Sequence, residues 1–600
     1  MSARARPWLP AVARWAPLVL AGAILIWHSL RYDFVTDDAY ISFVFARNLA
    51  EHGELAFNLG DPVEGYTNFL WTFILGVLML VGVPAPWAAK VLGTGFGLGT
   101  LYVTFRIGER LLGRGAPLAA LAPLLLACSS GFACWSSGGL ETQLYTFLIV
   151  VALDAYLEAS APTPAVTRAT PPRAPERTDR SRIADEAPGW QGARSGAHSP
   201  CVTDEQRSQP GWIGRENERV VRSGALRRMA IALALSAMTR PEGLLVAALF
   251  VVHRLATNLI GGRRLRPSRD ELLACAWFLG LWAPWFAWRW WYYGWPFPNT
   301  YYVKAAGTAV AGYEAKMRSH GWHYVGRWAE QSSLLWASPL LIAGAIARPR
   351  TARFVFVTLA VLVTAVYIRY AAGVGGDFMG LHRFIMPLFV LTALTVALGV
   401  DRLAGLLGAA WPRAVALAGG GLALLVLAGF AVTQQDLTDR SLAGLRPDRG
   451  IDTPGYLKLY AHDRLLIGER LRPCVRQGDF AIYGGVGALP WTAHLAGVDV
   501  FGLVSDEVAH RVPRTRDRPG HNKWAPDALL LEYRPTIVLH CYDLRGDPAP
   551  ARLGHCDAGF WERQGFERLV LHVPGLRERG EYLTFLARRD RALSCPGLSR

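Results

Sequence analysis

Long apolar runs, broken by polar segments, dominate residues 16–432 of the chain. Most of these runs approach the length that a helix needs to cross the hydrocarbon core of a bilayer. Because a chain in lipid must satisfy its own backbone polar groups, the runs predict about eleven membrane-spanning α-helices. The expected spans lie near residues 16–30, 88–106, 116–131, 141–158, 226–238, 241–257, 271–291, 331–348, 352–370, 384–401 and 412–432.

The apolar stretch 69–83 is left out of this set because of the charges that follow it. If it crossed the membrane, the basic segment 106–115 would face outward, against the retention of positive loops in the cytoplasm. An interfacial or re-entrant helix at 69–83 instead keeps this segment and the later arginine clusters inside. A true crossing is the alternative, since the stretch is apolar enough to insert. We therefore expect a cytoplasmic N-terminus and a first outer loop at 31–68.

Two regions depart from the membrane pattern. Residues 160–225 are rich in Pro, Arg, Ser and Thr with few aliphatic side chains, which is typical of a disordered linker, here a cytoplasmic one. Residues 433–600 alternate short apolar runs with Pro, Gly and charged turns, which predicts a soluble α/β domain. We therefore expect a membrane domain at 1–432 and a cap domain at 433–600 on the outer, periplasmic side.

Composition and charge agree with a membrane protein. The 600 residues are 52% apolar, include 22 Trp and carry a formal net charge of +16. Since the arginines fall mainly in loops between spans, their excess indicates retained cytoplasmic loops rather than nucleic-acid binding. It also favours attraction to anionic lipid or phosphate near the membrane.

Eight Cys form no CxxC pair, and half of them cluster in the C-terminal region. Cys474, Cys541, Cys556 and Cys595 can pair as disulfides if this region lies outside the cytosol, and buried reduced thiols are the alternative.

The chain lacks the motifs of nucleotide-driven and zinc-protease chemistry. It contains no GxxxxGK(S/T) phosphate loop, no Rossmann glycine fingerprint and no HExxH. A site on the outer face would also have no supply of nucleotide-activated substrate. Such a site has to use a donor that is carried in the membrane, such as a lipid-linked sugar.

Four polar stretches fall on the outer side of this topology. They read TDDAYIS (36–42), SSGGLETQ (136–143), YYGWPFPNTYYVK (292–304) and GGDFMGLHR (375–383). Ionisable groups at span ends are costly to desolvate unless they pair or bind a ligand, so their convergence on one face is a site hypothesis. The ionisable residues that they supply are Asp37, Asp38, Glu141, Lys304, Asp377, His382 and Arg383.

The acid pair Asp37–Asp38 has a structural alternative. Either carboxylate can cap the helix that begins beside it, but at most one fits that role well, so we expect the other to be functional. Glu141 suits a helix start as well as it suits a site. Arg240 and Glu242, at a proline-broken junction, are expected to form a structural ion pair.

Three residues supply cations where a phosphate group would sit. Lys304 offers a point charge and Arg383 a planar fork, and both geometries bind phosphate oxygens, with His382 beside them. Each cation can alternatively anchor the chain among lipid headgroups. The aromatic run 292–302 can likewise be an interfacial belt.

Taken together, several motifs resemble the membrane-embedded GT-C glycosyltransferases. Within this superfamily the chain is most similar to the terminal arabinofuranosyltransferases of mycobacterial cell walls and their bacterial relatives. The match covers the membrane part and continues into the C-terminal domain, while the linker has no counterpart. The motifs are the acid pair at 37–38, NLGDPVEGYTNFLW (58–71), SGGLETQLY (137–145), TRPEGLL (239–245), YYGWPFPNTYYVK (292–304), GGDFMGLHRFIMP (375–387), DVFGLVSDEVAHR (499–511) and GHNKW (520–524).

This resemblance implies transfer of a sugar from a polyprenyl-phosphate donor to a glycan or lipid acceptor on the outer face of the bacterial cytoplasmic membrane. It implies a multi-span core, juxtamembrane helices in the first outer loop and a periplasmic cap domain. The donor sugar stays open between arabinofuranose and another pentose or hexose.

The resemblance also implies roles for individual residues. The family's loop acid maps onto Asp37 or Asp38, either as the base for the acceptor hydroxyl or as a carboxylate beside a sugar cation. The residues expected to bind the leaving phosphate are Lys304, His382 and Arg383. The resemblance does not fix a cofactor. A divalent cation at the acid pair, as in some members of the superfamily, stays open, although it needs more oxygen ligands than can be assigned. The candidate substrate-binding residues are Glu64, Tyr66, Asn68, Glu141, Asn299, Tyr301 and Asp377.

Two other classes of function compete with an enzyme. A transporter or flippase of lipid-linked glycans would carry ionisable residues near mid-span and broken helices in related halves. Here the charges sit mainly at outer span ends, which favours the enzyme. A non-catalytic scaffold that displays residues 433–600 leaves the convergence of polar stretches unexplained.

Overall fold

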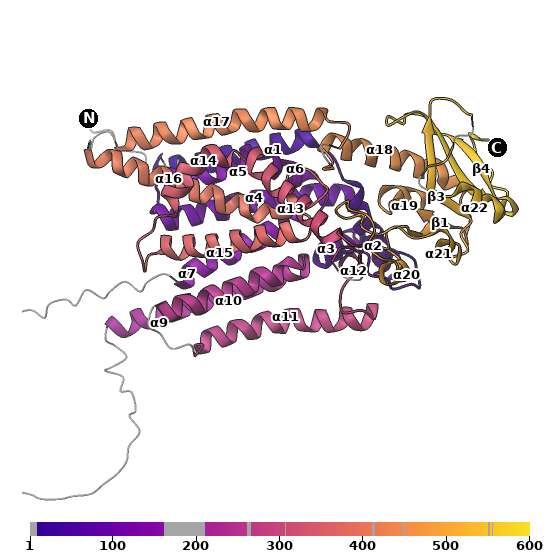
Figure 1. Ribbon diagram of the computed structural model, residues 1–600. Coiled ribbons are helices and arrows are strands. Elements are labelled where there is room, and N and C mark those ends of the chain that lie inside the picture. The colour runs from indigo at the N-terminus through magenta and orange to yellow at the C-terminus, as the bar shows by residue number, and fades with distance from the viewer. Residues whose placement is uncertain are drawn as a thin grey trace, which may run out of the picture.

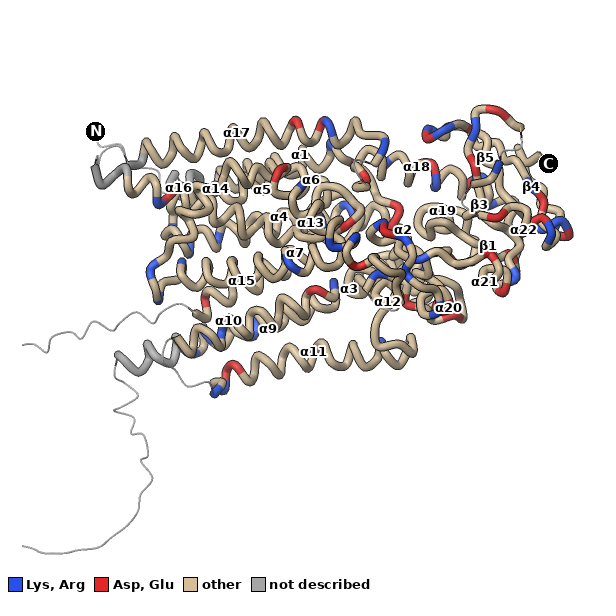
Figure 2. The backbone as a smooth tube through the Cα atoms, viewed as in Figure 1, with Lys and Arg blue, Asp and Glu red and all other residues tan. Residues whose placement is uncertain are grey.

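The computed structural model describes residues 9–160, 210–260, 266–305, 308–410, 415–447, 450–549, 552–554 and 556–599. Its long helices lie side by side in a bundle, and a sheet-containing C-terminal domain continues one end of that bundle (Figure 1). Charged residues gather toward the ends of the bundle and over the C-terminal domain, and helices such as α15 are uncharged along most of their lengths (Figure 2). This distribution fits a bundle whose middle lies in lipid.

A helix lies at each of the expected spans. By length and composition, five helices of the described residues are suited to cross a membrane, or up to seven if each of two bent pairs counts as one span. The chain is thus a multi-pass membrane protein, although fewer helices than expected meet this test, partly because α14 has only 12 residues. These helices are α1 (Leu9–Tyr32), α4 (Ala85–Leu112), α5 (Leu121–Cys128), α7 (Thr142–Ser160), α9 (Pro210–Thr239), α10 (Glu242–Ile260), α11 (Arg269–Tyr293), α14 (Leu334–Ala345), α15 (Ala352–Gly373), α16 (Met386–Ala410) and α17 (Val415–Ala443).

The segment between α1 and α4 folds into two short helices, α2 (Asp37–His52) and α3 (Phe69–Leu80). With 12 residues, α3 spans about 18 Å, well short of the roughly 30 Å of a hydrocarbon core. The axis of α2 is bent by 96° from that of α1. Both short helices lie where the bundle meets the C-terminal domain (Figure 1). The interfacial position of 69–83 in the membrane stays a prediction.

The expected linker 160–225 is partly helical, which corrects the prediction of disorder at its C-terminal end. The helix α9 (Pro210–Thr239) begins inside this stretch. Ala225 packs in one apolar cluster with Ala159 of α7, a contact that the polar composition of the segment did not indicate. The rest of the linker, 161–209, lies outside the described residues.

The C-terminal domain is an α/β unit, as expected. Because α17 runs on to Ala443, the domain starts later than the expected boundary at 433, with α18 (Pro454–Leu471). Its sheet has the strand order β2-β1-β3-β5-β4-β6, in which β1 pairs in parallel with β2 and β3 and the other pairs are antiparallel. Its strands and short helices are β1 (Phe480–Tyr483), α19 (Ala488–Ala493), β2 (Ala496–Asp499), α20 (Asp506–Arg511), α21 (Asp527–Leu531), β3 (Ile537–Arg545), α22 (Ala558–Arg563), β4 (Phe566–His572), β5 (Tyr582–Arg588) and β6 (Leu598–Ser599).

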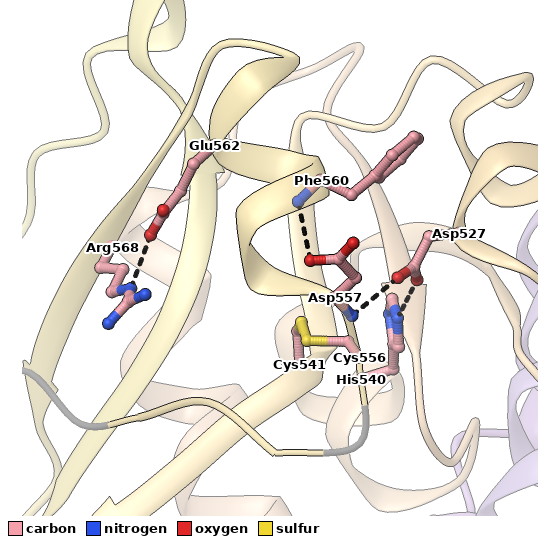
Figure 3. The surroundings of a disulfide bond; sticks show 8 residues. All are labelled: Asp527, His540, Cys541, Cys556, Asp557, Phe560, Glu562 and Arg568. Atoms are coloured by element: carbon pink, nitrogen blue, oxygen red, sulfur yellow. Dashed lines mark hydrogen bonds and ion pairs between the residues drawn. A yellow bond between two sulfur atoms is a disulfide. The ribbon is translucent and has the colours of Figure 1, made fainter.

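Two disulfides cross-link this domain. They pair the four clustered cysteines as Cys474–Cys595 and Cys541–Cys556, a choice that the sequence left open. Beside the second bridge, Asp527 hydrogen-bonds the ring of His540 and accepts a bond from a backbone N–H (Figure 3). The bridge therefore joins a central strand to the segment before α22.

The remaining helices connect the spans near the C-terminal domain. They are α6 (Ser130–Ser137), α12 (Asn299–Lys304), α13 (Tyr313–Gln331) and the 3-10 turn η2 (Arg383–Ile385).

Candidate active site

The acid pair begins α2, at a tight crossing of the chain. Thr36, the residue before the helix, donates its backbone N–H to the carbonyl of Gly138 at 3.2 Å. The next residue, Gly139, has a φ of +85°, and a Cβ there would lie 2.7 Å from Cγ1 of Val35. A glycine is therefore required at 139, because both the left-handed backbone and the close approach exclude a side chain.

Asp37 faces the C-terminal domain. Its Oδ1 accepts the backbone N–H of Ala488, the first residue of α19, at 2.8 Å. A Cβ on the adjoining Gly487 would lie 2.0 Å from the Asp37 carbonyl oxygen, so the two segments pack directly against each other. Burial, together with the neighbouring Asp38, raises the pKa of Asp37 to about 6, although the bond from Ala488 and Arg464 oppose the rise.

Asp38 faces the other predicted groups instead. No hydrogen bond or ion pair holds its carboxylate among the described residues, and it is partly exposed. Burial raises its pKa, as do Asp377 and Glu141, whereas Arg383 and Lys304 lower it. The structure thus brings these five predicted residues into one electrostatic group.

Neither acid caps α2. Thr36 is the N-cap residue of that helix, and no side-chain cap bond is present. The prediction that one of the two acids caps α2 is therefore wrong. Asp37 instead accepts a bond from the first residue of α19.

Arg383 and Asp377 form an ion pair, with 2.7 Å between Nε and Oδ2. Burial alone would raise the pKa of Asp377, but Arg383 and Lys304 hold it below its usual value. The positive charge of Arg383 is therefore already paired with Asp377 when no ligand is bound.

His382 does not supply the cation that we expected. Burial and the charge of Arg327 lower its pKa to about 3, so the ring is neutral at physiological pH. Its Nε2 hydrogen-bonds the side chain of Gln331 at 2.7 Å. A neutral ring of this kind can exchange hydrogen bonds with a ligand but cannot balance its charge.

Glu141 is the centre of a buried polar network. Asn68 donates to its Oε2 at 2.9 Å, and Nη1 of Arg240 lies 3.5 Å from its Oε1. Ser42 of α2 in turn donates to Asn68 at 3.0 Å. The expected ion pair of Arg240 with Glu242 is confirmed at 3.3 Å. The network ties α2 to the starts of α3, α7 and α10.

The other candidate substrate residues form a separate cluster. Nε of Arg289 lies 3.6 Å from Oε1 of Glu64, and the hydroxyls of Tyr66 and Tyr293 are 2.9 Å apart. Burial raises the pKa of Glu64 to about 8, although Arg289 opposes the rise. Among the described residues no interaction joins this cluster to Asp38.

Asn299 and Tyr301 also lie outside the Asp38 group. Asn299 donates to the carboxylate of Asp506 in α20 at 2.9 Å, and its backbone N–H bonds the carbonyl of Glu64. Tyr301 is 41% exposed beside the ring of Phe297. Asn299 thus connects α12 to the C-terminal domain, and the sequence had no means of separating these two residues from the site.

A polar cavity of about 370 Å³ opens beside the Asp377–His382 loop. Its lining includes His382, Arg327, Arg440 and Asp452. Asp452 exchanges backbone hydrogen bonds with Phe378 and Gly380, so this cavity directly adjoins the loop that holds Asp377.

The carboxylate of Asp452 is held by the C-terminal domain. Both of its oxygens accept from Nη2 of Arg518, at 3.1 and 2.9 Å. Burial raises the pKa of Asp452 to about 6, with Arg518 opposing and Asp38 and Asp377 contributing to the rise.

An apolar groove of about 400 Å³ meets the polar cavity. Helices α5, α14, α16 and α17 line it with side chains such as Leu340 and Phe430. Ser333, Trp336 and Thr433 line both hollows. An apolar path between helices therefore ends at a polar chamber whose lining carries both arginines and acids.

The sequence reasoning missed Arg327, Arg440 and Asp452. Arg327 lies in the same segment between α11 and α14 as Lys304, which was an available signal. Arg440 and Asp452 follow the last apolar run, in a stretch that was assigned to the soluble domain. Only the tertiary fold brings that stretch back to the loop at 377–382.

The described residues contain no group of three or more His, Cys, Asp or Glu that could hold a metal ion. Asp37 and Asp38 also face different partners. The acid pair as folded thus does not fit the divalent cation that the sequence analysis kept as an alternative.

No protein-family model matches the chain, and no curated protein matches it in sequence. Among solved structures, ArnT from Cupriavidus metallidurans bound to undecaprenyl phosphate overlaps with a TM-score of 0.53 at 11% identity, over 98% of this chain and 100% of that one. The same protein in the apo state gives 0.54 and 12%, with the same coverage. The oligosaccharyltransferase of Archaeoglobus fulgidus is more distant, with 0.46 and 9% over 84% of this chain and 65% of that one.

The overlap with the ArnT structures concerns the fold and extends over nearly the whole chain. The chain therefore has the GT-C fold, as the motifs led us to expect. At this level of identity the likeness does not identify a sugar or an acceptor.

Proposed function

We propose that this protein is a glycosyltransferase that moves a sugar from a polyprenyl-phosphate donor to a glycan or lipid acceptor of the cell envelope. The sugar is arabinofuranose, as the motif resemblance implies, or another pentose or hexose. The GT-C fold supports the class of reaction, and the ArnT structure with undecaprenyl phosphate supports a polyprenyl carrier.

The observation that carries this proposal is the continuity of the apolar groove with the polar cavity. A polyprenyl phosphate is a long apolar chain with one anionic end, and the two hollows offer these environments in that order. Arg327 and Arg440 bring cations to the polar end, where they are paired with Glu330 and Asp436 of the same lining. A phosphate bound there replaces or shares these partners through charge-assisted bonds. Lys304 does not line the polar cavity, but its charge acts on Asp38, which makes it a third candidate cation for the phosphate.

Asp38 is our candidate for the reacting carboxylate. It takes the proton of the acceptor hydroxyl while that oxygen forms a bond to the anomeric carbon of the donor sugar. The bond from this carbon to the phosphate oxygen breaks, and the polyprenyl phosphate leaves with the electron pair. A carboxylate whose pKa is raised by burial is suited to accept a proton near neutral pH.

Four further predicted residues orient or bind groups rather than react with the substrate. Arg383 fixes Asp377 beside Asp38, and Asp377 can hydrogen-bond sugar hydroxyls. Neutral His382 contributes a hydrogen-bonding group at the edge of the polar cavity. Asp37 anchors the C-terminal domain against the acid motif.

We place the reaction on the outer face of a bacterial cytoplasmic membrane, with the N-terminus in the cytoplasm. The two disulfides of the C-terminal domain support this orientation, because such bonds persist in oxidising compartments. The retention of positive loops in the cytoplasm supports it independently.

The proposal is tested with purified protein, radiolabelled polyprenyl-phosphate pentoses and hexoses, and membrane glycan acceptors. We expect transfer from one donor, a loss of about 10² to 10⁴-fold in Asp38→Asn, and a much smaller loss in Asp37→Asn, whose amide oxygen can still accept from Ala488. Thermal unfolding serves as the control for folding. Full activity of Asp38→Asn would remove it from the mechanism.

The same preparation in proteoliposomes separates an enzyme from a transporter. An enzyme forms a new glycosidic bond, which is detected as label in the acceptor. Labelled donor that crosses the bilayer without such a bond would instead identify a flippase.

A further inference from the structure

A second cavity, of about 350 Å³, lies at the same end of the bundle and shares no lining residue with the polar cavity. Four segments surround it: the turn after α1, the start of α2, the first turns of α4 and one face of α18. On α18 the lining residues are Lys458, Ala461, His462 and Leu465, whose spacing places them on one helix face.

The charge in this cavity is positive on balance. Lys90 donates to Asp33 at 2.6 Å, so these two groups neutralise each other. Lys458 donates one hydrogen bond, to the carbonyl of Tyr32 at 3.2 Å, and forms no ion pair among the described residues, although its charge also acts on Asp33. An ammonium group has three donors, so two remain for a ligand. His462 bonds the carboxylate of Asp463 at 3.0 Å.

The floor of the cavity is apolar. Phe34, Val35, Pro86 and Leu465 line it, and Trp87, at the start of α4, is 61% exposed. Tryptophan is common at the level of lipid headgroups, where lysine also reaches out of the hydrocarbon. A cation above an apolar floor at this level matches a phospholipid, whose phosphate adjoins its glycerol and acyl chains.

We propose that the pocket formed by Trp87, Lys90 and Lys458 binds the phosphate headgroup of an anionic membrane lipid. The inference is independent of the proposed transfer reaction, because it uses none of its residues. A lipid seated there contacts α1, α4 and α18 together, and so joins the bundle to the C-terminal domain.

Native mass spectrometry of the full-length protein in detergent tests this site. We expect the first phosphatidylglycerol to bind more tightly than phosphatidylcholine. Since one lysine near an anionic surface contributes about fivefold in affinity, Lys458→Gln should weaken phosphatidylglycerol binding about fivefold and Lys90→Gln with Lys458→Gln about 25-fold. Lys458→Arg keeps the charge and should keep the affinity.

The matched control is Lys316→Gln, since Lys316 is an exposed lysine on α13 with an ion-pair partner of its own, Asp517, at 3.7 Å. It should leave lipid binding unchanged. Equal binding of phosphatidylglycerol to wild type and Lys458→Gln would overturn the proposal, as would equal binding of the two lipids. A third outcome is that inorganic phosphate displaces the lipid and that its binding depends on Lys458. This outcome would show that the ligand is free phosphate and not a lipid headgroup, and would overturn the proposal.

Discussion

At the first turn of α2, two neighbouring carboxylates have different partners. Asp37 accepts a backbone hydrogen bond from α19, while Asp38 faces Arg383 and Lys304 without a hydrogen bond of its own in the described structure. Consecutive residues of a helix point about 100° apart, so a single step along the chain moves a side chain from one domain contact to another. Residue type alone could not assign these roles.

The raised pKa of Asp37 predicts a pH dependence of stability. Its pKa is about 6 in the folded protein against about 4 in an unfolded chain, so folding favours the protonated form. The contribution of Asp37 to the free energy of unfolding is therefore fully present below about pH 4 and is lost as the pH rises through about 6. We expect Asp37→Asn to flatten the pH dependence of the thermal unfolding midpoint over this interval. An unchanged slope in the variant would assign the dependence to other groups, such as Asp452.

At the scale of elements, the contact between α2 and α19 depends on a missing side chain. Any Cβ at Gly487 would collide with Asp37, so Gly487→Ala has to push α19 away from the acid motif. We expect a loss of about 1 to 3 kcal/mol in stability, with reduced transfer activity. Gly326→Ala is the matched control, since a Cβ at this exposed helical position meets nothing within 4 Å. Equal stability of the two variants would show that the contact is not tight in solution.

The groove between α14, α16 and α17 permits a second test at this scale. Gly429 lines it, and a Cβ there meets no other atom within 4 Å, so Gly429→Trp fills the groove without a clash in the helix. We expect a loss of polyprenyl-phosphate binding of tenfold or more, since the ring occupies the path of the chain. The control Gly420→Trp lies on the same helix, outside the groove lining, and should bind normally. Equal binding by the two variants would exclude the groove as the site of the chain.

The helices themselves were the most predictable part of the protein. Hydropathy located a helix at each expected span, while the interfacial position of α3, which rests on the arginines of the segment 106–115, stays a prediction. Helix termini were less predictable, as α9 and α17 show, because they depend on packing with neighbours. The polar stretches were found because charges are costly beside lipid.

Across the whole molecule, the candidate site joins segments that are far apart in the sequence. Asp452 and Arg518 meet the loop at 377–382 only because the C-terminal domain folds back over the end of the bundle. Local patterns carry no information on such contacts, so Arg440 and Asp452 could not be predicted. For the same reason the sequence joined Glu64 and Asn299 to the Asp38 group, from which the structure separates them.

The pairing of four cysteines gives a prediction at this scale. Of the seven Cys that the structure describes, four are in two disulfides and three are free, so denatured protein from the native membrane should take up four more maleimide labels after reduction than before it. Mass spectrometry counts the added labels. Eight labels without reduction would place the C-terminal domain in a reducing compartment and contradict the proposed orientation.

If the protein binds a polyprenyl carrier as we propose, the length of the apolar groove limits how much of that carrier it can contact. From Leu425 to Thr433, its lining on α17 extends over eight residue steps, or about 12 Å. A chain held over this distance is read only at the isoprene units next to its phosphate, and the rest stays among the bilayer lipids. Carriers that differ only in their distal units should therefore serve equally well, and the rate of supply should follow lateral diffusion within the leaflet.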